Sequence, residues 1–108
     1  MENAITIYKQ IYPYQCPVLA KLGFKSIINL RPDDEMAGQP KSDELLSSAK
    51  REGLSYYHLP FSNEQLHLGL VRDFVHVLSD MPKPVLVFCG TGARAKRLYQ
   101  SAVVSKLL

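Results

Sequence analysis

The chain has 108 residues, enough for one hydrophobic core and too few for two, so residues 1–108 are expected to form one domain. Hydrophobic residues make up 46% of the chain and charged residues 21%, a balance that excludes a globally disordered protein. The formal net charge is +3, and the lysines and arginines are scattered in runs no longer than a pair, so no nucleic-acid-binding patch is expected.

The first third of the chain predicts a strand, a helix and a second strand. Ala4–Tyr8 alternates apolar and polar side chains, which is typical of a short strand. Pro13 can open a helix that runs to Leu22. Lys25–Leu30 is a β-branched apolar run of the kind found in buried parallel strands, and a polar loop over Arg31–Lys41 follows it.

The rest of the chain continues the alternation. Ser42 is a plausible N-cap for a helix that ends before Gly53. Leu54–Leu59 predicts the third strand, and apolar residues at helical spacing predict a helix over Gln65–Ser79. Val85–Phe88 is the fourth strand, and a glycine-containing turn separates it from a last helix that extends to near the C-terminus.

Strands that alternate with helices favour the α/β class, here a four-stranded, mostly parallel sheet flanked by about four helices. Ligands of such sheets bind beyond the carboxyl ends of the strands, where the strand order reverses. The loops that follow Tyr8, Leu30, Leu59 and Phe88 are therefore where a functional site is expected.

Several classes of protein are excluded by what the chain does not contain. The longest apolar run, Val85–Cys89, is too short to cross a membrane. The first residues have neither the basic segment nor the apolar stretch of a signal peptide, so a cytoplasmic location is expected. Cys16 and Cys89 are then expected as free thiols. The three histidines lie in three separate segments and form no cluster with zinc-ligand spacing, so no metal site is expected. No feature of the chain implies an organic cofactor.

One segment, Val85–Lys96, combines several features that favour anion binding. A buried strand ends at Cys89, and the glycines that follow allow a tight turn whose N–H groups point inward, ahead of a helix N-terminus. Arg94 can hold an oxyanion with two parallel N–H groups. The same field favours the thiolate of Cys89, the nucleophilic form of a cysteine.

These features predict the site. Cys89 is the expected nucleophile and Arg94 the expected oxyanion clamp, and the cradle for the anion is expected from the backbone of Gly90, Thr91, Gly92, Ala93 and Ala95. A purely structural interpretation also exists, in which Cys89 is a small apolar residue at a strand end and the glycines only form a turn. The order of strand, cysteine, glycines, arginine and helix favours the functional interpretation.

The sequence Cys-x-x-Gly-x-Arg resembles the active loops of cysteine-dependent protein phosphatases and of rhodanese-type sulfurtransferases. Further segments resemble the phosphatase-like domain of the bacterial beta-lactamase hydrolase-like proteins: Leu-Gly-Phe-Lys-Ser-Ile-Ile-Asn-Leu-Arg-Pro-Asp (22–33), Gly-Gln-Pro (38–40) and Gly-Leu-Ser-Tyr-Tyr-His-Leu-Pro (53–60). The resemblance implies a dual-specificity-phosphatase-like fold. The strand before Cys89 would be central in it, between the first strand and Ile27–Leu30.

The resemblance implies a phosphatase-like hydrolase that acts on a phosphate ester through a phosphocysteine intermediate. Only four residues separate Cys89 from Arg94, a spacing usual in rhodaneses, so a sulfurtransferase that carries a Cys89 persulfide is the alternative. Phe88 and Ala95 replace side chains that usually assist phosphatases, and Glu64 is the only carboxylate soon after the third strand. An oxyanion-binding module with weak or no turnover is therefore a third possibility.

Arg31 and Asp33 follow a strand that should neighbour the Cys89 strand, so they are candidate substrate-binding residues at the rim of the site. Surface turn chemistry would explain them equally well. In each interpretation the expected partner is an anionic substrate, either a phosphate ester or a sulfur donor. Neither nucleic acid nor membrane is expected, and the oligomeric state stays open.

Overall fold

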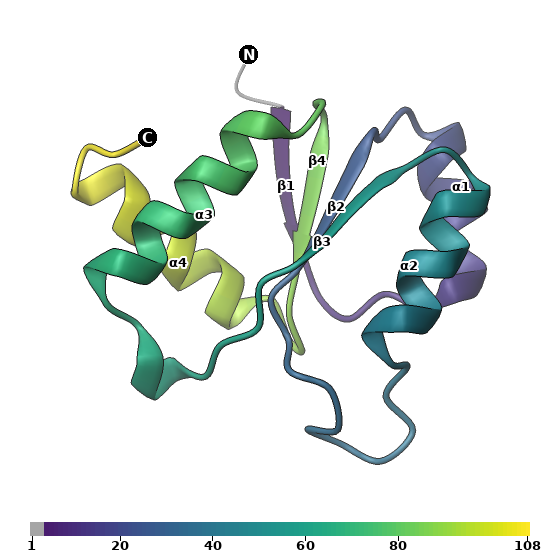
Figure 1. The fold of residues 1–108 in the computed structure, drawn as a ribbon, viewed down its shortest axis with the longest axis horizontal. Coiled ribbons are helices and arrows are strands. Elements are labelled where there is room, and N and C mark those ends of the chain that lie inside the picture. Colours follow the sequence, from purple (N-terminus) through teal and green to yellow (C-terminus); the bar gives the residue numbers. More distant parts are fainter. Residues whose placement is uncertain (1–3) are drawn as a thin grey trace.

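The computed structural model describes residues 4–108 as a parallel four-stranded sheet with helices on both faces (Figure 1). The strands are β1 (Ile5–Tyr8), β2 (Ser26–Asn29), β3 (Ser55–His58) and β4 (Val85–Phe88). Their order is β1-β4-β2-β3, and every neighbouring pair is parallel. The last strand in the chain therefore lies inside the sheet, between β1 and β2, as the family resemblance implied.

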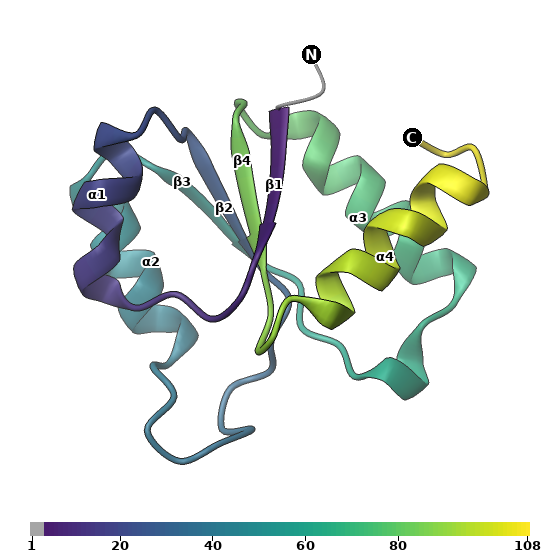
Figure 2. The same cartoon turned by 180° about the vertical axis from the view of Figure 1, so that it is seen from behind.

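The helices form one layer on each side of the sheet (Figure 2). A short 3-10 turn (Pro13–Gln15) leads into α1 (Cys16–Lys21), which packs with α2 (Ser42–Arg51) on one face. On the other face lie α3 (Leu68–Asp80) and α4 (Ala93–Val104). A second 3-10 turn (Asn63–Gln65) precedes α3. The α/β architecture, the four helices and the four-stranded parallel sheet predicted from the sequence are all confirmed.

Side chains along each strand point alternately to the two faces of the sheet, so the core consists of two apolar clusters. Ile27, Leu86 and Phe88 face α1 and α2, while Val85 and Val87 face α3 and α4. The strands β2 and β4 are buried along their whole length, which explains why their sequences read as continuous apolar runs. Within residues 4–108, no helix has the length and apolar character needed to cross a membrane.

Three helix starts differ from the sequence prediction. The predicted first helix is divided into the 3-10 turn Pro13–Gln15 and α1. Pro17 has no N–H to donate to the carbonyl four residues before it, so the turn ahead of α1 keeps the 3-10 pattern. The third helix begins at Leu68, where the imidazole of His67 accepts a hydrogen bond from Leu70 N at 3.2 Å. Ser42 is the first helical residue of α2 and not its N-cap, because Lys41 occupies the N-cap position.

Backbone hydrogen bonds connect the loops at the carboxyl ends of the strands. Beyond the strands themselves, Leu30 N donates to Phe88 O at 2.9 Å, and Gln10 N donates to Gly90 O at 3.1 Å. The loops after β1 and β2 are thus tied to the chain that leaves β4. The segment after β3 joins them, since Phe61 N donates to Leu30 O at 3.2 Å. This edge of the sheet is where the sequence predicted a site.

Candidate active site

The Cys89 thiol lies at the end of β4 and is almost fully buried, with 1% of the residue exposed. Two backbone amides point at its sulfur: Gly92 N is 3.1 Å from Sγ and Ala95 N is 3.4 Å from it. Ala95 belongs to the first turn of α4, whose N-terminus carries a partial positive charge. The sulfur thus accepts hydrogen bonds from two backbone amides at the start of a helix.

The two glycines of the turn differ in what their positions demand. Gly92 has a φ of +96°, a left-handed conformation that residues with a Cβ rarely adopt. Gly90 makes room for Arg31, because a Cβ at position 90 would lie 3.3 Å from Arg31 Cζ. Within residues 4–108, the structure gives no hydrogen-bond acceptor to the amides of Gly90, Thr91 and Arg94. These N–H groups are donors available to an anion.

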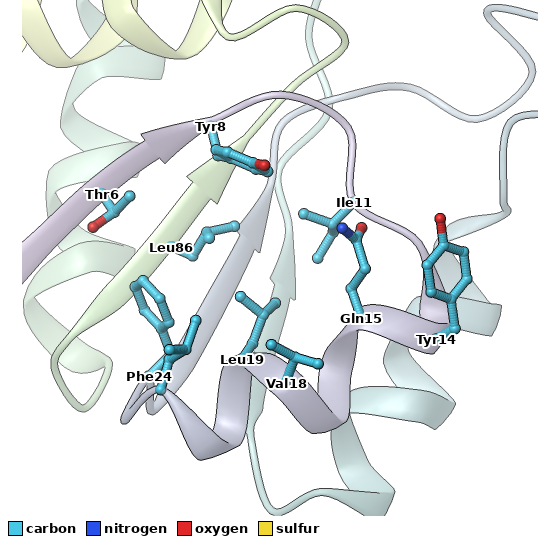
Figure 3. Close-up of a pocket in the computed structure, with 10 residues that line it drawn as sticks. Thr6, Tyr8, Ile11, Tyr14, Gln15, Val18, Leu19, Phe24 and Leu86 are labelled. Carbon is cyan, nitrogen blue, oxygen red and sulfur yellow. The ribbon is translucent and has the colours of Figure 1, made fainter.

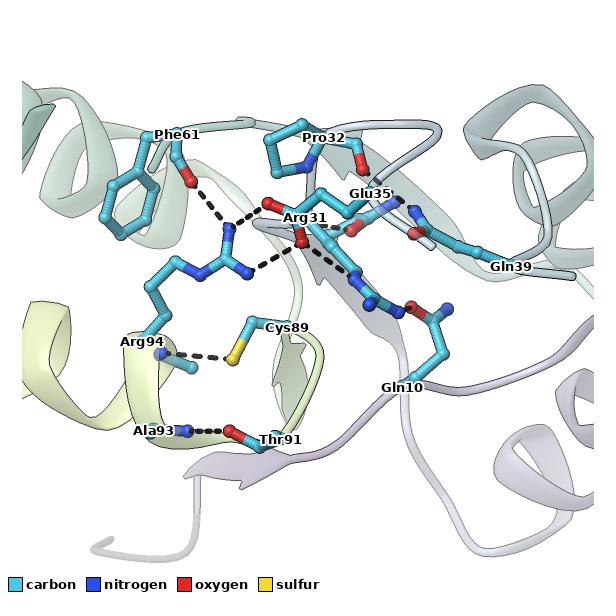
Figure 4. A network of polar contacts seen from close by, with 12 residues as sticks. Gln10, Arg31, Pro32, Glu35, Gln39, Phe61, Cys89, Thr91, Ala93 and Arg94 are labelled. Carbon is cyan, nitrogen blue, oxygen red and sulfur yellow. Dashed lines mark hydrogen bonds and ion pairs between the residues drawn. The ribbon is translucent and has the colours of Figure 1, made fainter. Parts of the chain in front are cut away.

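The guanidinium of Arg94 is held from two directions (Figure 4). Nη1 donates to Phe61 O at 2.8 Å and to Glu35 Oε2 at 2.9 Å, and Nη2 donates to Glu35 Oε1 at 2.8 Å. Only 15% of the Arg94 side chain is exposed. The loop after β2 and the segment after β3 therefore fix the orientation of an arginine that α4 provides.

A second guanidinium, that of Arg31, meets the same carboxylate. Arg31 Nε donates to Glu35 Oε1 at 2.9 Å, and Arg31 Nη1 donates to Gln10 Oε1 at 2.9 Å. The hydrogen bond from Arg94, reinforced by that from Arg31, lowers the pKa of Glu35 below its usual value. Glu35 is thus an ionised carboxylate shared by two arginines, and sequence reasoning missed it.

The backbone of Arg31 is fixed by side chains from β2 and β3. Arg31 N donates to Asn29 Oδ1 at 2.8 Å, and Arg31 O lies 2.7 Å from His58 Nε2. The buried Asn29 in turn donates to Tyr56 Oη at 2.9 Å, and Tyr56 shares a hydrogen bond of 2.8 Å with Ser42 Oγ. Burial raises the pKa of Tyr56, so its hydroxyl stays protonated in this network.

The other predicted or considered residues occupy different places. Asp33 Oδ1 accepts a hydrogen bond from Ser42 N at 2.8 Å, so its carboxylate serves the start of α2. Glu64 is exposed, and its own backbone amide together with Ser62 lowers its pKa. Cys16 is buried in the core on the α1 and α2 face, and this burial raises its pKa. In the part of the chain that the structure describes, no group of His, Cys, Asp and Glu side chains could hold a metal ion.

A separate, largely apolar pocket of about 480 Å³ lies between β1 and α1 (Figure 3). Thr6 and Tyr8 of β1 line one side, and Val18 and Leu19 of α1 line the other. Cys89 packs in the apolar cluster on the opposite face of the sheet. This pocket is therefore not part of the site around the thiol.

The chain is similar in sequence to a known family of proteins. The family model described as "Beta-lactamase hydrolase-like protein, phosphatase-like domain" matches residues 1–105. The chain belongs to this family. A beta-lactamase hydrolase-like protein of Agrobacterium fabrum is 37% identical over 99 residues, which cover 92% of this chain and 23% of the relative. The chain thus spans about a quarter of the length of that curated relative.

Solved structures agree with the family assignment. A Neisseria meningitidis protein proposed to be a phosphatase superposes with a TM-score of 0.83 and is 28% identical, over 89% of this chain and 68% of that one. The P. aeruginosa protein TpbA, solved in complex with phosphotyrosine, has a TM-score of 0.63 at 14% identity, over 83% of this chain and 51% of TpbA. At that identity the likeness to TpbA shows the fold alone. The chain is a phosphatase-like domain.

Proposed function

We propose that this domain is a cysteine-dependent phosphatase in which Cys89 is the nucleophile and Arg94 the oxyanion clamp. The observation that carries the proposal is the position of Cys89 Sγ, which accepts two amide hydrogen bonds at the start of α4 beside an arginine held by Glu35 and Phe61. A thiolate next to amide and guanidinium donors can attack the phosphorus of an anion bound by those donors.

The reaction would proceed in two displacements at phosphorus. In the first, Cys89 Sγ forms a bond to phosphorus while the ester P–O bond breaks, and the leaving oxygen takes the electron pair. In the second, water attacks the phosphocysteine, the S–P bond breaks and inorganic phosphate leaves, which restores the thiolate. The amides of Gly90, Thr91 and Arg94 and the Arg94 guanidinium would hold the non-bridging oxygens throughout.

The carboxyl groups near the site favour one class of leaving group. Glu35 and Glu64 both have lowered pKa values, so neither is protonated near neutral pH and neither is suited to act as a general acid. An aryl ester needs little proton transfer, because a phenolate is a stable leaving group. Activated aryl phosphates are therefore the proposed substrate class. The phosphotyrosine bound to TpbA, a protein of the same fold, is also an aryl phosphate, although its phenol is not activated.

The test compares p-nitrophenyl phosphate with an alkyl ester, glycerol phosphate, in the wild type and in Cys89→Ser. The proposal expects turnover of the aryl ester that depends on Cys89, little turnover of the alkyl ester, and a phosphoryl adduct on Cys89 by mass spectrometry. A parallel incubation with thiosulfate tests the alternative function, that of a sulfurtransferase. The spacing of four residues between Cys89 and Arg94 favours this alternative. A sulfur adduct that cyanide removes, without Cys89-dependent hydrolysis of the aryl ester, would overturn the phosphatase.

A further inference from the structure

Glu35 has no part in the two displacements, and yet it is the carboxylate at the centre of the site. It belongs to the polar loop between β2 and α2 and reaches Arg94, which lies 59 residues further along the chain. The Glu35 side chain is 28% exposed, and the side chains of the two arginines that bind it are more buried. Its three hydrogen bonds come from Arg94 Nη1, Arg94 Nη2 and Arg31 Nε.

The donors of Arg94 can be counted one by one. A guanidinium has five N–H groups: one on Nε and two on each Nη. Glu35 takes one from each Nη, and Phe61 O takes the second one of Nη1. Among the described residues, no acceptor takes the Nε–H or the second Nη2–H. These two N–H groups lie on the same edge of the plane and form a second two-donor fork. In Figure 4 that edge is on the side where Cys89 lies.

We propose that Glu35 is a positioning residue that holds Arg94 by its outer end and so presents the Nε and Nη2 edge to the oxyanion above Cys89. The inference rests on the proposed function for its catalytic consequence, while its binding consequence stands by itself. By taking Arg31 Nε as well, Glu35 sets the spacing of two guanidinium groups at the rim of one cradle. Arg31 is tied on its other side to Gln10 of the loop after β1.

An opposite role is conceivable for the same contacts. A carboxylate bound to two arginines resembles a bound oxyanion, and a substrate would then have to displace Glu35 before it could bind. The two roles predict opposite changes in oxyanion affinity when Glu35 is removed. Removal of a positioning residue weakens oxyanion binding, because Arg94 loses its fixed orientation. Removal of a competing carboxylate strengthens oxyanion binding, because the anion no longer has a rival.

The experiment measures sulfate binding by titration calorimetry in the wild type, Glu35→Gln and Glu35→Ala. Sulfate is the probe because it remains a dianion throughout the pH range used. The matched control is Asp34→Asn, which removes the neighbouring carboxylate of the same loop, paired only with the exposed Lys41. Loss of one or two charge-assisted hydrogen bonds should weaken sulfate binding in both Glu35 variants by about tenfold, and the control should stay within about twofold. Thermal unfolding confirms that each variant is folded, and Glu35→Gln keeps the shape of the side chain if Glu35→Ala does not fold.

A pH series separates positioning from a general loss of structure. The groups that face Glu35 are Arg94 of α4 and Arg31 of its own loop, and both keep its pKa below the usual value. The advantage of the wild type over Glu35→Gln should therefore persist from neutral pH into the mildly acidic range and disappear as the pH falls through the pKa of Glu35. Loss of the difference already near neutral pH, where Glu35 is ionised, would overturn the proposal.

The kinetics of p-nitrophenyl phosphate hydrolysis by the Glu35 variants provide a second, independent test. With Arg94 misaligned, kcat should fall by about tenfold or more and KM should change less, because the guanidinium binds most tightly to the transition state. Tighter or unchanged sulfate binding in Glu35→Gln would overturn the positioning role even if Cys89-dependent turnover is present. Absence of turnover in the wild type would overturn the proposed phosphatase, and sulfate binding would still decide the role of Glu35.

Discussion

Two loops meet at the site, and they are held in place by different parts of the chain. The loop from Cys89 to Arg94 is shaped by backbone: amides point at the sulfur, and Gly92 takes a left-handed conformation. The loop that carries Arg31 and Glu35 is held by side chains, chiefly Asn29, which bonds Arg31 N. Substitutions of the Cys89 or Arg94 side chain should therefore change chemistry and leave the fold intact, whereas substitutions beneath the second loop should change stability as well.

The largest effect is expected from Cys89→Ser. Loss of the thiolate should reduce turnover of p-nitrophenyl phosphate by at least about 10³-fold, because a serine hydroxyl without a general base is a poor nucleophile. The amides remain, so sulfate affinity and thermal stability should be close to those of the wild type. A variant that no longer folds would support the purely structural interpretation of Cys89 and would erase the contrast between the two loops.

The next largest effect is expected from Arg94→Lys, which keeps the charge and removes the planar fork. An ammonium cannot bond Glu35 and Phe61 O and still offer two parallel donors to an anion. Sulfate binding should weaken by about 10- to 100-fold, the equivalent of roughly 1.5–3 kcal/mol for charge-assisted hydrogen bonds. Calorimetry checks this, and an unchanged dissociation constant would remove Arg94 from the oxyanion site.

The side-chain network under the second loop is tested by Tyr56→Phe. The change leaves the buried Asn29 Nδ2 and Ser42 Oγ without a partner, which should lower the free energy of unfolding by about 1–2 kcal/mol. Tyr57→Phe is the matched control, since Tyr57 is the next residue of β3 and is 45% exposed. Denaturant unfolding measures both, and equal stability in the two variants would show that the network does not hold this loop.

The smallest effect is expected from Glu64→Gln. Glu64 is exposed and its pKa is lowered, so it carries no proton to donate near neutral pH. Turnover of p-nitrophenyl phosphate should stay within about twofold of the wild type, since a general acid contributes far more, about 10²–10⁴-fold, where one operates. Steady-state kinetics would contradict this expectation if the variant lost a tenfold factor on the aryl ester.

The same division explains what could be predicted from the sequence. The parallel sheet, the bounds Val85–Phe88 and the glycine-rich turn follow from local patterns, because strand periodicity and glycine conformations depend on near neighbours. The link between Glu35 and Arg94 joins residues 59 positions apart, and the one between Asn29 and Tyr56 joins residues 27 apart. Local patterns do not settle which acid of the Asp33–Glu35 run turns inward. A hint existed in the spacing of Arg31 and Glu35, four residues apart.

The order of the strands has a consequence for synthesis and folding. Because β4 lies between β1 and β2, the first 84 residues can form only the β2–β3 pair, and β1 has no neighbour until β4 has emerged. A nascent chain would thus wait for its last strand before the sheet closes, which makes folding depend on contacts between distant residues. Cys89, the proposed nucleophile, follows that strand directly. The proposed site around Cys89 is therefore assembled in the same event that completes the sheet, and a chain that lacks β4 cannot contain it.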